Sequence, residues 1–192
     1  MKQDIFFMSG FPRAGTTLLM NILAQNPKFH PTPTSGLIAS VLQVRGNWRN
    51  NENFLAMPED HVYPRIKTML KSMMYGFYEN EINAGQIPID KNRAWVSNMD
   101  FLDEILETKV KFIYPIRHVV DCLISLEKIR RKSQINIDPH KNKAKAMTTI
   151  GRAENYLNEQ DVVGMPIQGL REIITRKDYD RLMLVPFDDL LR

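Results

Sequence analysis

The stretch DIFFMSGFPRAGTTLLMNIL, residues 4–23, constrains the fold more than any other part of this 192-residue chain. It begins with an apolar run at residues 4–8 that stops short of Gly10, which is typical of a buried parallel strand. A glycine loop follows, and further along the leucines and isoleucine recur at helical spacing, with Thr16 and Thr17 as candidate caps. A strand, a glycine loop and a helix in this order predict the opening unit of an α/β fold.

The rest of the chain continues this alternation of strands and helices. Strands are predicted within 85–95, at 109–116 and at 181–187, and helices at 36–48, 59–79, 97–107, 117–132, 148–159 and 167–177. The proline-rich segment 25–36 is predicted to be a turn region, and the basic segment 133–147 a mobile loop. The alternation favours a three-layer α/β/α fold with a central parallel sheet, and the length fits a single domain over residues 1–192.

The composition and charge of the chain indicate which kind of ligand it binds and in which compartment it is found. The net charge is +4 and the pI about 9.2, and the densest basic segment, residues 128–145, contains no aromatic side chain that could stack on a base. We therefore expect an anionic small molecule rather than nucleic acid as the ligand. The single cysteine, Cys122, suits a reducing compartment, and the sequence shows neither a signal segment nor an apolar run of membrane-spanning length. These features predict a cytoplasmic protein without stable membrane insertion and leave the oligomeric state open.

The glycine loop has the spacing of a phosphate-binding loop. Where two glycines five residues apart, such as Gly10 and Gly15, precede a helix, backbone N–H groups and the helix dipole point at one anion. An ATP-binding loop would carry lysine at position 16, and a metal-positioning aspartate would end one of the strands. Here Thr16 replaces the lysine, Arg117 follows the predicted strand, and Arg13 adds a positive charge inside the loop. The loop thus predicts a phosphate-like ligand without a triphosphate tail or a metal ion.

A second anion-binding pattern follows the strand predicted at 109–116. Arg117 leaves the carboxyl end of this strand, where ligands of parallel α/β sheets bind, and Ser125 lies eight residues later on the predicted helix. The arginine could bind a phosphate through its charged fork and the serine through one hydrogen bond. Taken alone, the two residues favour the alternative of a solvated arginine and an ordinary helix serine without a ligand.

Together the two patterns resemble those of the sulfotransferase family, whose donor is 3′-phosphoadenosine 5′-phosphosulfate (PAPS). The segment GFPRAGTTLL looks like the family's 5′-phosphosulfate loop, and YPIRHVVDCLISL is similar to its 3′-phosphate motif. The resemblance implies a P-loop-like sulfotransferase fold whose donor-binding residues here are Pro12, Arg13, Ala14, Gly15, Thr16, Thr17, Arg117 and Ser125. The arginine at position 13, together with PIDKNRAW and LMLVPFDDLL, is closest to the tyrosylprotein and prokaryotic branch. Members of the family continue beyond the FDDLL segment, so the resemblance also implies that the family's C-terminal part is missing here.

The resemblance implies transfer of a sulfuryl group from PAPS to a hydroxyl or amine of a small-molecule, carbohydrate or peptide acceptor. Arg13 and Lys91 are the catalytic candidates, because positive charge near the bridging oxygen stabilises the negative charge that develops there. His30 and Asp90 are candidates for the general base, and neither is assigned.

Some residues and functions stay open at this level. Arg93 and Trp95 could line the acceptor or adenine pocket, or they could simply pack, and His61 and His118 are weaker candidates for the base. A P-loop small-molecule or nucleotide kinase is one alternative function. A catalytically inactive relative that binds PAPS or its product is the other.

Overall fold

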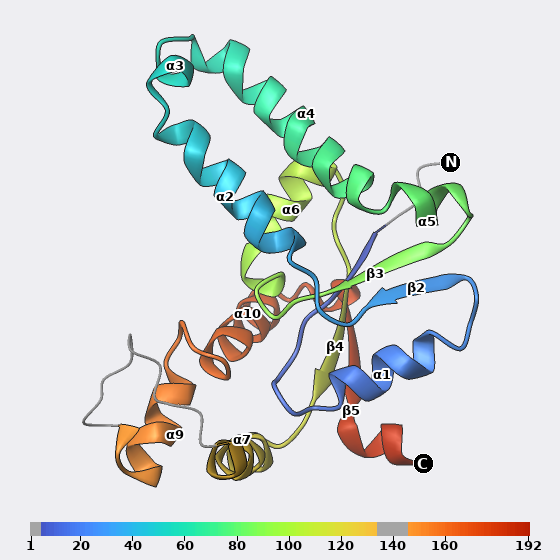
Figure 1. The fold of residues 1–192 in the computed structure, drawn as a ribbon, viewed down its shortest axis with the longest axis vertical. Coiled ribbons are helices and arrows are strands. Elements are labelled where there is room, and N and C mark those ends of the chain that lie inside the picture. The colour runs from blue at the N-terminus through green and yellow to red at the C-terminus, as the bar shows by residue number, and fades with distance from the viewer. Residues whose placement is uncertain (1–4, 134–145) are drawn as a thin grey trace.

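A five-stranded sheet lies at the centre of the fold, in the order β2-β3-β1-β4-β5, and each neighbouring pair is parallel. The computed structural model describes residues 5–133 and 146–192 (Figure 1). The strands are β1 (Phe6–Met8), β2 (Phe29–Thr32), β3 (Ile87–Lys91), β4 (Phe112–Ile116) and β5 (Leu182–Pro186). Because the strands are parallel, all five carboxyl ends meet at one edge of the sheet.

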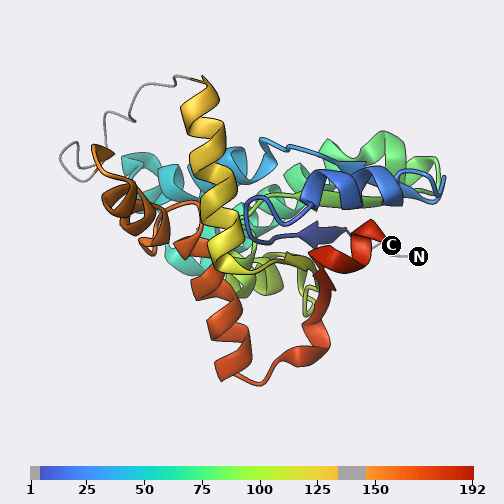
Figure 2. The ribbon, with the colours of Figure 1, turned by 90° about the horizontal axis from the view of Figure 1, so that it is seen from below.

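Helical segments connect the strands and cover both faces of the sheet. The α-helices are α1 (Thr16–Leu23), α2 (Leu37–Arg49), α3 (Glu52–Leu55), α4 (Glu59–Phe77), α5 (Glu79–Asn83), α6 (Met99–Leu106), α7 (Val119–Ser133), α9 (Thr149–Leu157) and α10 (Gly164–Thr175). Three short 3-10 segments are η1 (Val96–Asn98), η2 (Tyr179–Arg181) and η3 (Phe187–Leu191). Figure 2 shows α7 standing across the carboxyl end of the sheet, beyond the loop that joins β1 to α1. The predicted α/β architecture with a central parallel sheet is therefore confirmed.

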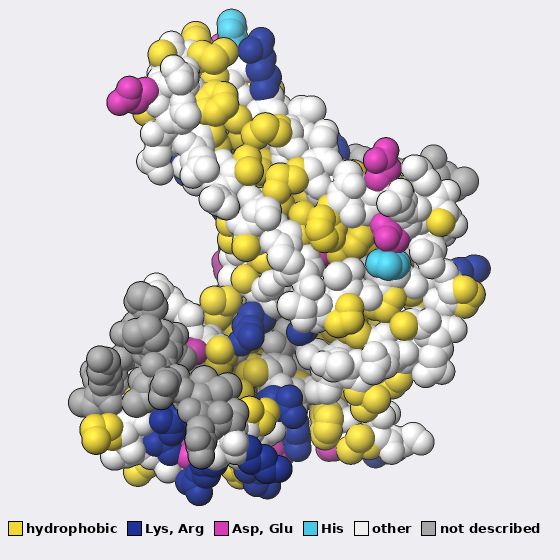
Figure 3. All heavy atoms as spheres, in the orientation of Figure 1, with side chains coloured by type: hydrophobic (Ala, Val, Ile, Leu, Met, Phe, Trp, Pro, Cys, Tyr) yellow, Lys and Arg dark blue, Asp and Glu magenta, His cyan; other side chains and the backbone are white. Residues whose placement is uncertain are grey.

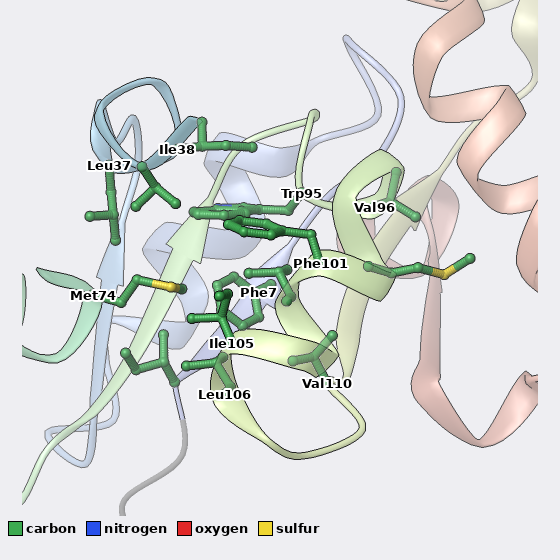
Figure 4. Packing of buried hydrophobic residues seen from close by; sticks show 14 of the residues in the cluster. Phe7, Leu37, Ile38, Met74, Trp95, Val96, Phe101, Ile105, Leu106 and Val110 are labelled. Atoms are coloured by element: carbon green, nitrogen blue, oxygen red, sulfur yellow. The ribbon is translucent and has the colours of Figure 1, made fainter. Parts of the chain in front are cut away.

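Two apolar clusters lie on the two faces of the sheet, because successive side chains of a strand point to opposite sides. Phe7 belongs to the larger cluster, which includes residues of α2, α4, α6 and α10, and its ring lies 4.9 Å from that of Trp95 in an edge-to-face arrangement (Figure 4). Met8, the next residue, belongs to the smaller cluster, formed with α1 and with Leu190 of η3. The short strand β1 is thus buried from both sides and fixes the start of the loop that follows it.

A hairpin of α2 and α4, with α3 at its tip, projects from the sheet (Figure 1). Figure 3 shows a hollow on this face, between the hairpin and the part of the chain that carries α7 and α9, with Lys and Arg side chains along its floor. None of the helices within residues 5–133 and 146–192 is long and apolar enough to cross a bilayer.

Two segments differ from their predicted structure, and a third lies outside the described residues. β2 forms inside the segment predicted to be a turn region. It tolerates Pro31 because it is an edge strand, and a proline on the open side of an edge strand lacks only an N–H that has no partner strand to pair with. The helix predicted to begin after Pro166 begins at Gly164, since proline in a first helical turn removes no intrahelical bond. The mobile loop predicted at 133–147 falls almost wholly outside the described residues.

Candidate active site

The loop between β1 and α1 lies tightly against β4. The backbone N–H of Ser9 donates to the carbonyl of Ile113 (3.1 Å), and that of Phe11 donates to the carbonyl of Pro115 (3.4 Å). A Cβ atom added at Gly10 would lie 2.7 Å from the carbonyl oxygen of Pro115, closer than such atoms approach. The first glycine of the motif is therefore required by this close approach of two backbones.

The second glycine sets the conformation at the start of α1. Gly15 is the N-cap, with a left-handed φ of 78°, and no side chain caps the helix. Thr16 and Thr17, predicted as candidate caps, are instead the first two residues of the helix, because the left-handed turn at Gly15 starts the helix one residue earlier. The uncapped N–H groups and the positive end of the helix dipole are the features that bind an anion.

Arg13 joins the loop to the second predicted pattern. Its Nε donates to the hydroxyl of Ser125 on α7 (3.0 Å), and its backbone carbonyl accepts from Nη1 of Arg117 (3.1 Å). Arg13 also has a left-handed φ of 66°, which is uncommon for a residue with a side chain. Nε of Arg117 lies 4.0 Å from the carboxylate of Asp121, one turn further along α7. The structure thus brings together, from β1, β4 and α7, the polar side chains expected to bind the donor.

Phe187, which was not among the predicted site residues, packs against this group of side chains. The guanidinium carbon of Arg117 lies 4.2 Å from the centre of the Phe187 ring. A Cβ atom added at Gly15 would lie 2.8 Å from Cδ2 of the same ring and 2.9 Å from Cδ1 of Leu190. The segment η3 therefore packs against both anion-binding patterns.

Lys91 ends the strand on the other side of β1. In the parallel register it is paired with Met8, and the backbone N–H of Asn92 donates to the carbonyl of Met8 (3.0 Å). The hydroxyl of Ser9 donates to the carbonyl of Arg93 (2.8 Å), so the loops that follow β1 and β3 are joined. Lys91 is half-buried, and burial first, then the charge of Arg93, lower its pKa. Both catalytic candidates thus lie at the carboxyl edge of the sheet, Arg13 in the loop after β1 and Lys91 at the end of β3.

Asp90, a candidate base, is fully buried within a hydrogen-bond network. Its carboxylate accepts from the indole N–H of Trp95 (2.6 Å) and from the hydroxyl of Tyr78 (2.5 Å), and that hydroxyl also hydrogen-bonds Thr32 (3.0 Å). Burial and the adjacent charge of Asp90 raise the pKa of Tyr78. These contacts give Asp90 a structural role, and Trp95 packs in the core rather than lining a pocket.

The three histidines that the structure describes all lie outside the group formed by Arg13, Arg117 and Ser125. His30 lies on the edge strand β2, with Nε2 3.7 Å from a carboxylate oxygen of Glu81. His61 lies on α4 of the projecting hairpin, beside Asp60 at 3.9 Å. His118 is exposed next to Arg117. The described part of the chain contains no group of three His, Cys, Asp or Glu side chains that could hold a metal ion.

Comparisons with known proteins give the family and the fold of the chain. A model of the sulfotransferase family matches residues 5–192. The sulfotransferase domain from the Synechococcus PCC 7002 olefin synthase is similar, with a TM-score of 0.52 and 19% identity, over 98% of this chain and 67% of that chain. The sulfotransferase domain from the curacin biosynthetic pathway has a TM-score of 0.58 and 17% identity, over 98% of this chain and 68% of that chain. At these identities the likeness concerns the fold alone, and no curated protein sequence matches the chain.

Proposed function

The chain belongs to the sulfotransferase family, and on that premise we propose that it transfers a sulfuryl group from PAPS to a hydroxyl or amine acceptor. One observation carries the proposal: the uncapped start of α1 and the pair of Arg117 and Ser125 meet at Arg13. PAPS carries a 5′-phosphosulfate and a separate 3′-phosphate, so a protein that binds it needs two anion sites side by side.

The residues present fit the two ends of this donor. The backbone N–H groups that begin α1, with the hydroxyls of Thr16 and Thr17, supply donors for the phosphosulfate without a side-chain cap in competition. Arg117 is 28% exposed, so its planar fork remains accessible to a phosphate, and Ser125 can add a hydroxyl.

Catalysis then depends on positive charge close to the oxygen that leaves the sulfur. Arg13 is held inside the loop after β1, and Lys91 is the last residue of the neighbouring strand β3, so both cations lie at the carboxyl edge of the sheet. A preorganised cation stabilises the developing negative charge without reorganising during the reaction, and such electrostatic stabilisation is often the largest contribution to catalysis. The acceptor we propose is a small molecule, carbohydrate or peptide that enters from the hollow in Figure 3.

Calorimetric titration with 3′,5′-ADP, which carries both phosphates and no sulfate, tests the donor assignment. We expect the wild-type protein to bind and Arg117→Ala to bind about 10- to 100-fold more weakly, because hydrogen bonds to charged groups contribute roughly 1.5–3 kcal/mol. Arg176→Ala is the matched control, since this arginine pairs with Asp100 on the surface of α6 and α10. A folded wild-type protein that does not bind 3′,5′-ADP would refute the proposal.

A transfer assay then separates catalysis from binding at Arg13. We expect Arg13→Ala to abolish turnover while 3′,5′-ADP binding is largely kept, because we assign the side chain to the sulfuryl group and the variant keeps the backbone carbonyl that accepts from Arg117. Unchanged turnover in this variant would remove Arg13 from the catalytic group.

A further inference from the structure

Phe187 contacts both halves of the proposed donor site. It is the first residue of η3 and is half-buried. Its ring lies 4.2 Å from the guanidinium carbon of Arg117, and the same ring packs where a side chain on Gly15 would have to be. The same ring thus packs against both the arginine and the start of α1.

The sheet topology explains why these residues meet. β4 and β5 are neighbours, and their register pairs Ile116 with Pro186, the last residue of each strand. Arg117 and Phe187 are the next residues of their chains, so they leave the sheet at the same level and side by side. The contact is therefore fixed by two backbones rather than by a flexible surface loop.

Arg117 has a competing partner within reach. Its Nε lies 4.0 Å from the carboxylate of Asp121, a side chain that is 53% exposed. A full ion pair with this carboxylate would use the N–H groups that a phosphate needs. Stacking on an aromatic face uses none of them, because the ring contacts the flat face of a guanidinium rather than its edge, where Nη1 of Arg117 donates to the carbonyl of Arg13.

We propose that Phe187 is a positioning residue that holds the guanidinium of Arg117 edge-on for the 3′-phosphate of the donor and away from Asp121. The inference rests on the proposed function for the identity of the phosphate. It adds a residue that acts through Arg117 rather than on the reacting atoms.

The test compares two ligands and four proteins. The ligands are 3′,5′-ADP and 5′-AMP, which lacks the 3′-phosphate, and the proteins are wild type, Phe187→Leu, Phe187→Tyr and Leu190→Ala. Phe187→Leu keeps apolar volume but removes the aromatic face, so we expect the preference for 3′,5′-ADP over 5′-AMP to fall about fivefold, as for a partly exposed cation–π contact. Phe187→Tyr keeps the face and should restore the preference.

Leu190→Ala controls for general loosening of η3, since Leu190 packs near Gly15 and in the smaller apolar cluster. It should weaken both ligands alike and leave their ratio unchanged. An unchanged ratio in Phe187→Leu, or an equal fall in Phe187→Tyr, would overturn the positioning role.

A proton NMR measurement on the ligand-free protein keeps this inference distinct from the donor assignment. The Arg117 side-chain δ protons should show an upfield ring-current shift that Phe187→Leu abolishes. Absence of this shift in wild type overturns the contact itself. A shifted resonance in a protein that does not bind 3′,5′-ADP overturns the donor assignment, and with it the phosphate role, while the contact between the two side chains stands.

Discussion

Replacing Gly15 by alanine should destabilise the protein and disturb the donor site at the same time. The residue has a φ of 78°, and an L-residue held in the left-handed region costs about 1–2 kcal/mol. The new methyl group would also lie 2.8 Å from Phe187 and 2.9 Å from Leu190, so both side chains must move. Overpacking of this kind costs about 1–3 kcal/mol, which together with the backbone cost brings the expected loss to about 2–5 kcal/mol.

Urea denaturation followed by circular dichroism measures this loss directly. The midpoint should fall with an unchanged m-value, which shows that stability rather than the compactness of the unfolded state has changed. Gly46→Ala is the matched control, because Gly46 lies in α2 with no atom within 4 Å of an added Cβ. This control should be stabilising by up to about 1 kcal/mol, since alanine is the better helix former.

Measuring Gly15→Ala in a Leu190→Ala protein separates the cost of the left-handed backbone from the cost of the steric clash. Leu190→Ala removes one of the two clashing side chains, so Gly15→Ala should cost about 1 kcal/mol less in that background, while the backbone cost remains. The reasoning is refuted if Gly15→Ala lies within about 0.5 kcal/mol of wild type, the usual effect of a surface change. Affinity for 3′,5′-ADP should fall in parallel, since the same residue starts α1.

Two further predictions concern buried polar and charged groups. Asp90→Ala should lower the free energy of unfolding by about 3 kcal/mol, because Trp95 and Tyr78 each lose a buried acceptor; a loss below about 1 kcal/mol in urea denaturation would contradict the structural role. Glu127 accepts hydrogen bonds from Arg152, and mainly for this reason the pKa of its carboxyl group is lowered to about 2 from an ordinary value of 4.5. The contribution of this pair to stability is therefore fully present above pH 4.5 and is lost as the pH falls toward 2. Urea midpoints measured across this range should decline less steeply in Glu127→Gln than in wild type, and equal slopes would argue against the pair.

The sequence predicts those strands and helices whose own apolar pattern specifies them. The apolar run before Gly10 and the run before Arg117 each predict a strand, and the helices after them follow from apolar spacing. Parallel topology then predicts that both loops lie at one edge, and the hydrogen bond between Arg13 and Ser125 agrees with that expectation. Arg13, Arg117 and Ser125, which we propose to bind the donor, lie in or next to these segments.

Other features depend on neighbours that no local pattern specifies. β2 contains His30 and Pro31, which break the alternation typical of a strand, and it forms because it can pair with β3. Asp90 looks like a polar residue at the end of a strand, yet Tyr78 reaches it from the end of α4. The contact of Phe187 with Arg117 follows from strand order, because the pairing of β4 with β5 places the two residues side by side.

The register of β4 with β5 also has a consequence for how the protein is made. Translation delivers the N-terminal part first, so the glycine loop and α1 leave the ribosome long before the fifth strand does. Until that strand has docked, Arg117 lacks the aromatic ring that covers its face in the finished protein. The contact between Phe187 and Arg117 therefore forms only after β5 has been made, and a nascent chain that ends before β5 carries both motifs proposed to bind phosphate but lacks this ring.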